Sequence, residues 1–158
     1  MSDSKRKRAI AAMVARLQEI TEDNGYSSDA GEHVFIGENP TLGPDDAEAV
    51  LAVIVQPVFP SFQNEHLLER LPLEIQALAP AGSVPYESME DALADVKKAI
   101  ELRDEDLDED DARRFGTAVQ RDGIERGITQ IAERPEGSQY AGLSVTYTLL
   151  IREVWGSP

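Results

Sequence analysis

The longest strand pattern in this chain reads Gly137-Ser-Gln-Tyr-Ala-Gly-Leu-Ser-Val-Thr-Tyr-Thr-Leu-Leu-Ile-Arg-Glu-Val-Trp-Gly-Ser-Pro158. Apolar and polar residues alternate within it, and this period of two is typical of a strand that turns one face to a core. The apolar face carries Leu143, Val145, Tyr147, Leu149 and Ile151, and the wetter face carries Ser144, Thr146, Thr148 and Arg152.

A turn and a less regular segment precede this strand. Residues 134–138 contain Pro135 and Gly137, which predicts a turn and therefore a hairpin. In the segment before the turn, isoleucines at 124, 128 and 131 are spaced too irregularly to separate strand from helix. Gly123 and Gly127 favour a bent strand.

Two amphipathic helices are predicted from apolar residues that recur at steps of three and four. The first can be capped by Ser2, Asp3 or Ser4 and ends at Asn24-Gly25. The second begins at Ser88 as its cap. The apolar stripes are Ile10, Met13, Val14, Leu17 and Ile20 in the first helix, and Met89, Leu93, Val96 and Ile100 in the second.

Three further strands are expected. Residues 33–37 form a short one, and the apolar run 48–59 indicates a strand buried on both faces, with a helix as the competing interpretation of its first half. Residues 70–78 alternate, and Pro72 marks a strand start or a sheet edge. Residues 65–70 fit a helical turn. The sequence thus predicts one α+β domain over residues 1–158, with a mostly antiparallel sheet of four to five strands covered by two main helices.

The charge balance limits the classes of function. Thirty acidic and 15 basic side chains give a formal net charge of −15, which argues against a general nucleic-acid binder because such proteins neutralise phosphates. The acidic run at residues 104–111 is expected to be exposed, as an outer loop or a fraying helix end. The chain has no cysteine, which excludes disulfides and thiolate metal sites. No apolar run reaches membrane-spanning length, so no membrane partner is expected.

Motifs that carry chemistry are not found. The sequence has no GxxxxGK loop, no GxSxG elbow and no HExxH pair. Asp104, Asp106 and Asp108 have the spacing of a calcium loop, but Glu109 stands where the glycine belongs and Phe115 where the bidentate glutamate belongs. We therefore expect no catalytic, metal or cofactor-binding residues, and an interaction protein rather than an enzyme.

Several phrases together resemble the tail terminator and tail completion (minor tail) proteins of long-tailed bacteriophages, along essentially the whole chain. They are the opening helix that ends near Tyr26, the apolar strand Val50 to Phe59, Leu71-Pro-Leu-Glu-Ile75, the helix ending Ala94-Asp-Val-Lys-Lys-Ala-Ile-Glu101, Arg134-Pro-Glu-Gly-Ser138 and Glu153-Val-Trp-Gly-Ser-Pro158.

The resemblance implies a structural virion protein. In that family, a hexameric ring caps the tail tube, stops its polymerisation and offers a surface for joining the head. The implied partners are further copies of the chain, the tail tube protein and a head-tail connector protein, while DNA passes the bore without specific binding. The implied location is the head-proximal end of the tail in the virion, and the host cytoplasm during assembly.

Candidate contact residues are those that are apolar or cationic against the general trend of the chain. They are Lys5, Arg6, Lys7, Arg8, Phe59, Phe62, Val154 and Trp155. Core packing competes as an interpretation of Phe59 and Trp155, and a solvated terminus competes for the four cations. Other functions stay open: a head-to-tail connector or neck protein, an acidic inhibitor that mimics DNA, or an enzyme of unknown type.

Replacing Trp155 by alanine tests the contact assignment. If Trp155 lies in a subunit contact, Trp155→Ala lowers the fraction of protein in rings and leaves the thermal unfolding midpoint of the subunit unchanged. Light scattering and circular dichroism measure the two quantities. Unchanged assembly, or a variant that unfolds at a clearly lower temperature, would contradict the assignment of Trp155 to a subunit contact.

Overall fold

A computed structural model describes residues 4–37, 50–56, 61–63, 66–80, 86–101, 123–134, 136–137 and 140–154. In chain order the elements are α1 (Lys5–Gln18), 3₁₀ helices at Glu22–Asn24 and Ala30–Glu32, β1 (Val34–Ile36), β2 (Val50–Val55), β3 (Ser61–Gln63), β4 (His66–Pro80), α2 (Tyr86–Glu101), β5 (Ile124–Ile131) and β6 (Tyr140–Val154).

All strands belong to one sheet in the order β1-β2-β4-β6-β5, and β3 pairs with the beginning of β4. This confirms the α+β class and the two main helices. The expected mostly antiparallel sheet is corrected to a mixed sheet, because β1 and β2 run parallel. Residues 37–49 separate these two strands, and a link of that length permits the crossover that a parallel pair needs. The short strand β3 was not expected.

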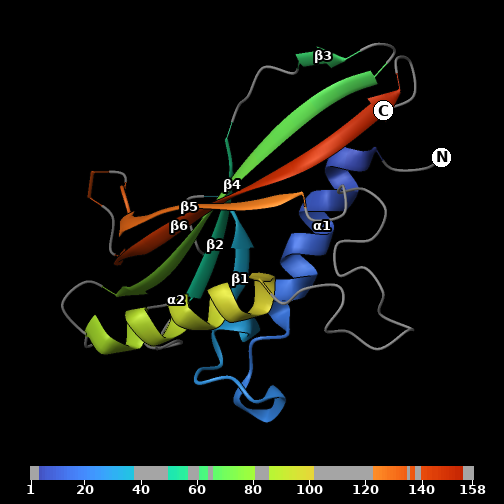
Figure 1. Cartoon of the computed structure of the whole chain (residues 1–158). Coiled ribbons are helices and arrows are strands. Elements are labelled where there is room, and N and C mark those ends of the chain that lie inside the picture. The colour runs from blue at the N-terminus through green and yellow to red at the C-terminus, as the bar shows by residue number, and fades with distance from the viewer. Residues whose placement is uncertain are drawn as a thin grey trace.

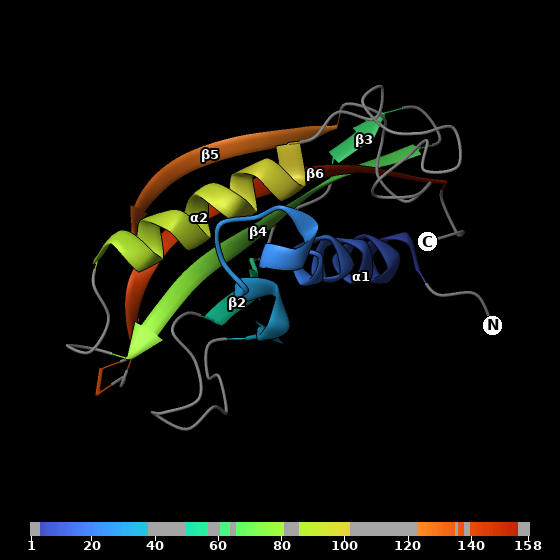
Figure 2. The ribbon, with the colours of Figure 1, turned by 90° about the horizontal axis from the view of Figure 1, so that it is seen from below.

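The core lies between the sheet and the two helices, which cover the same face of the sheet (Figures 1 and 2). The apolar face of β6 is buried as its alternation predicts, with Tyr147 and Leu149 fully buried. The stripes of both helices meet this face, since Leu17 of α1 and Val96 of α2 pack in the same cluster.

The apolar run in β2 is explained by burial on both faces. Leu51 and Val53 belong to the core under the helices, whereas Val50 and Ala52 pack with Leu78 on the opposite face. The prediction of a strand buried on both faces is therefore confirmed, and the helical interpretation of its first half does not hold for residues 50–55.

Strand β4 corrects two predictions. It begins at His66, so residues 66–70 are strand and not a helical turn. Pro72 lies inside this central strand and not at a start or an edge. The carbonyl of Pro72 accepts from the N–H of Gln56 at 3.1 Å, so its backbone points toward β2 just past the last residue of that strand. The backbone groups of the residues on either side of Pro72 point toward β6. Because Pro72 points the other way, its missing N–H removes no hydrogen bond from the β4–β6 ladder.

The helix boundaries differ slightly from those predicted. Ser4 caps α1, which ends at Gln18, and Gly25 with a φ of 88° instead closes the following 3₁₀ helix. Helix α2 begins at Tyr86, so Ser88 is inside the helix and is not its cap.

The hairpin and the bent strand are both confirmed. Strand β5 pairs with β6, and the register shifts between Arg126 and Thr129, around Gly127. Gly137 in the turn has a φ of 81°, which glycine adopts without strain.

At Gly142 the backbone of β6 lies close against the backbone of β4. A Cβ there would lie 2.0 Å from the carbonyl oxygen of Ala77, which is backbone and cannot move aside. We expect Gly142→Ala to lower the free energy of unfolding by about 3 kcal/mol. The matched control is Gly25→Ala, where a Cβ meets nothing within 4 Å and only the positive φ is strained, for a loss of about 1 kcal/mol. Urea unfolding measures both, and equal losses would contradict the close approach.

Candidate assembly surfaces

The structure brings most of the predicted contact residues to one end of the sheet. Phe62 of β3 pairs with Leu67 at the start of β4, and Val154 at the end of β6 pairs with His66. The first turn of α1 lies at the same end as β3 (Figure 1). We call this region, comprising residues 5–8, 61–63, 66–68 and 152–154, the β3 end.

The basic first turn of α1 is partly used by the fold itself. Ser4 Oγ accepts from the N–H of Lys7 at 3.2 Å and caps the helix. The guanidinium of Arg6 forms an ion pair with the carboxylate of Glu69, which is largely buried on β4. Arg6 therefore holds α1 against the sheet. Lys7 and Arg8 are exposed on the same turn, and Lys5 is half-buried.

Some of the predictions fall outside the described residues. Phe59, Trp155, the acidic run at 104–111 and the calcium-like spacing within it all belong to this group.

The structure adds three contact candidates that the sequence reasoning missed. Ile36 on β1 is 65% exposed, and Ile128 and Ile131 on β5 are 75% and 78% exposed. Strands β1 and β5 form the two opposite edges of the sheet. For β5, the irregular spacing of the isoleucines at 124, 128 and 131 could have indicated exposure. That spacing does not put all three side chains on one buried face of a strand or helix.

Hydrogen bonds fix which backbone groups point outward at each edge. In the first edge strand, the carbonyl of His33 and the N–H of Gly37 bond to β2, both at 2.8 Å. The alternate residues, Val34 and Ile36, therefore direct their backbone groups away from the sheet.

On β5, the N–H of Ala132 donates to the carbonyl of Gly142 on β6 at 2.9 Å. By the same alternation, Thr129 and Ile131 direct their backbone groups outward. Within the described residues, no strand pairs with either outer edge.

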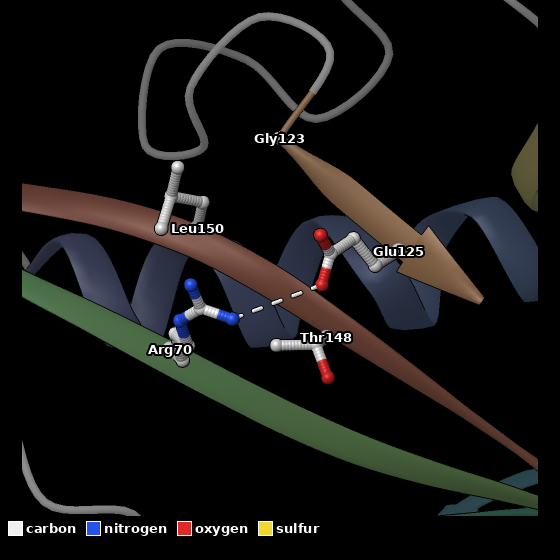
Figure 3. A pocket seen from close by; sticks show the side chains of 5 residues that line it. All are labelled: Arg70, Gly123, Glu125, Thr148 and Leu150. Atoms are coloured by element: carbon white, nitrogen blue, oxygen red, sulfur yellow. Dashed lines mark ion pairs between the residues drawn. The ribbon is translucent and has the colours of Figure 1, made fainter. Parts of the chain in front are cut away.

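A shallow hollow of about 110 Å³ lies on the sheet face opposite the helices (Figure 3). It is lined by Arg70, Gly123, Glu125, Thr148 and Leu150. An ion pair spans it, with 3.9 Å between Arg70 Nη1 and Glu125 Oε2. Both side chains are mostly exposed, so the pair contributes little to stability.

A buried tyrosine joins three elements on the helix face. Tyr147 of β6 donates its hydroxyl proton to Glu101 Oε2 at 2.8 Å, at the end of α2. Glu101 Oε1 lies 3.4 Å from Nε of Arg126 on β5. Burial, and next the hydrogen bond to Glu101, raise the pKa of Tyr147 above its ordinary value of 10.0. The sequence placed Tyr147 on the apolar face but gave no sign of this hydrogen bond.

Asp95 anchors the loop that follows the first 3₁₀ helix. Its buried carboxylate accepts from the N–H of Ser27 at 3.1 Å and from Oγ of Ser28 at 2.7 Å. One turn further along α2, the ammonium of Lys98 lies 4.8 Å from the ring centroid of Tyr26. These contacts hold α2 against the N-terminal part of the chain. They give the buried carboxylate of Asp95 a structural role.

Among the described residues, no three His, Asp or Glu side chains are grouped closely enough to hold a metal ion. In that part of the chain, no helix is both long and apolar enough to cross a bilayer. No protein-family model matches the sequence, and no curated protein matches it either. The described surface does offer exposed isoleucines on both edge strands and the β3 end as candidate contacts.

The Tyr147 hydrogen bond predicts a stability difference that depends on pH. Tyr147→Phe should lower the free energy of unfolding by about 1.5 kcal/mol at neutral pH. The native state keeps its phenol proton above pH 10.0, where the unfolded chain releases it, so the wild type loses stability as the pH rises further. The difference between wild type and variant should therefore narrow above pH 10.0. Urea unfolding from pH 7 to 11 measures this, and a constant difference would contradict it.

Proposed function

We propose that this chain is a subunit of a ring that caps the tail tube of a long-tailed bacteriophage, stops tube polymerisation and provides a surface for head joining. The observation that carries the proposal is the pair of exposed apolar edges at opposite sides of one sheet, Ile36 on β1 and Ile131 on β5. A contact between two different surfaces of one chain is heterologous, and it closes into a ring when the rotation between copies permits.

The β3 end supports a second contact in a different direction. It lies at the end of the long strands β4 and β6 (Figure 1), whereas β1 and β5 are the two edge strands of the sheet. A subunit can thus join its neighbours through the edges and meet the tail tube protein through the β3 end. Lys7 and Arg8 are exposed there, in a chain with a net charge of −15. These cations suit an acidic patch on the tube.

The acidic balance of the chain also supports a ring around DNA. A duplex repels a surface of its own charge, so DNA moves through an acidic bore without being held. In the virion we place the ring at the head-proximal end of the tail, with the head-tail connector protein on its far side. Assembly takes place in the host cytoplasm.

Solution mass is the first test. We expect a closed ring, hexameric by the resemblance, either for the protein alone or after tail tube protein is added. Size exclusion with light scattering over a concentration series gives the mass, and negative stain shows the ring. In the same assay, tail tube protein should form shorter tubes when the cap is present.

Each other result has a defined meaning. A monomer or dimer at every concentration, unchanged by tube protein, contradicts the proposal. If that species also strips a nuclease or polymerase from DNA, the chain is an acidic inhibitor. A ring that binds connector protein and leaves tube length unchanged identifies a neck protein instead of a tail cap.

A further inference from the structure

We infer that neighbouring copies join by pairing β5 of one subunit with β1 of the next in antiparallel register, so that the sheet continues from subunit to subunit. This inference rests on the proposed function only in requiring that the chain assembles with itself. The partner of each edge is a second copy of this chain.

Strand directions support this pairing. Strands β2 and β6 both run antiparallel to β4, β1 runs parallel to β2, and β5 runs antiparallel to β6. The two edge strands therefore run in opposite directions. When a second copy is added beside the first in the same orientation, its β1 meets β5 antiparallel. This is the more stable arrangement for two strands.

The outward-facing residues at the two edges have side chains on the same face. Ile36 pairs with Val53 and Ile131 pairs with Leu143, and both partners belong to the core under the helices. A joint between these edges therefore keeps the helices of both subunits on one side. It also places Ile36 and Ile131 directly or diagonally opposite each other, which buries two of the most exposed apolar side chains of the described residues.

The two edges also match in length and in charge. Beyond the shift around Gly127, β5 has a regular segment Thr129-Gln130-Ile131, and β1 is the three-residue segment Val34-Phe35-Ile36. Neither segment contains a charged residue, although 28% of the chain is charged. Within these two segments, two strongly acidic subunits therefore place no like charges opposite one another. Edge strands that stay unpaired usually contain charged side chains, which discourage pairing with another chain. These two segments contain none.

The absence of cysteine makes a direct test possible. Cysteines at both edges, in the double variant Ile36→Cys/Ile131→Cys, are treated with a short bis-maleimide, which tolerates either register of the joint. We expect a ladder of covalent oligomers that stops at the number of subunits in the ring. An equal mixture of the two single variants should stop at a dimer, because each copy then carries one reactive edge.

The controls separate the joint from random collision. The matched control is Ile36→Cys/Glu90→Cys, because Glu90 is exposed on α2 and belongs to neither edge strand. It should give at least tenfold less cross-linked product than the edge pair. Circular dichroism of each variant checks the fold, and since Ile36 and Ile131 are exposed, neither substitution removes a core side chain.

The outcomes distinguish this joint from the proposed function. A ring by light scattering with no cross-linking above the control overturns the joint and leaves the ring cap intact. A ladder without an upper limit, with filaments in negative stain, supports the joint and overturns the cap. Efficient cross-linking of a single variant to itself indicates a two-fold dimer and overturns the joint. A monomer under all conditions, with and without tail tube protein, overturns both.

Discussion

The ladder between β4 and β6 is the interaction on which the rest of the structure depends. Each strand has 15 residues, and they pair without interruption from His66 with Val154 to Pro80 with Tyr140. Fifteen consecutive pairs give both strands one register, and this register sends the alternating apolar residues of both strands to the same face. A slip of one residue would turn that face outward. The helices, the flanking strands and the edges all take their positions from this pair.

Polar contacts fasten the helices to this pair at three places. Arg6 pairs with Glu69 at the start of α1, Asp95 holds the loop before β1 against α2, and Tyr147 binds Glu101 at the end of α2. Each contact involves a group that is largely or wholly buried, where a lost partner is costly. Both helices are thereby held to one face, and β1 and β5 remain the edges of the sheet.

The candidate site was only partly predictable. The cations of the first helix turn, Phe62 and Val154 were selected because they oppose the trend of the chain, and the fold gathers them at the β3 end. The edge isoleucines were missed, because a sequence gives the face of a strand residue but not the place of the strand in the sheet. In the sequence, Ile36 and Val53 are both β-branched apolar residues in predicted strands, and nothing local distinguishes them. One is exposed and the other is fully buried, since β1 is an edge and β2 is not.

The sequence by itself determined the α+β class and the two amphipathic helices, because these depend on local periodicity. It favoured a strand buried on both faces at 48–59 and a bent strand before the turn at 134–138, with a helix left open in each segment. Only the tertiary structure decided which strands are neighbours, that β1 and β2 run parallel, and that β4 extends through Pro72 back to His66. These features depend on pairing between residues far apart in the chain. Pro72 is tolerated in a central strand because its backbone points to the place where β2 has ended, and no local pattern contains that information.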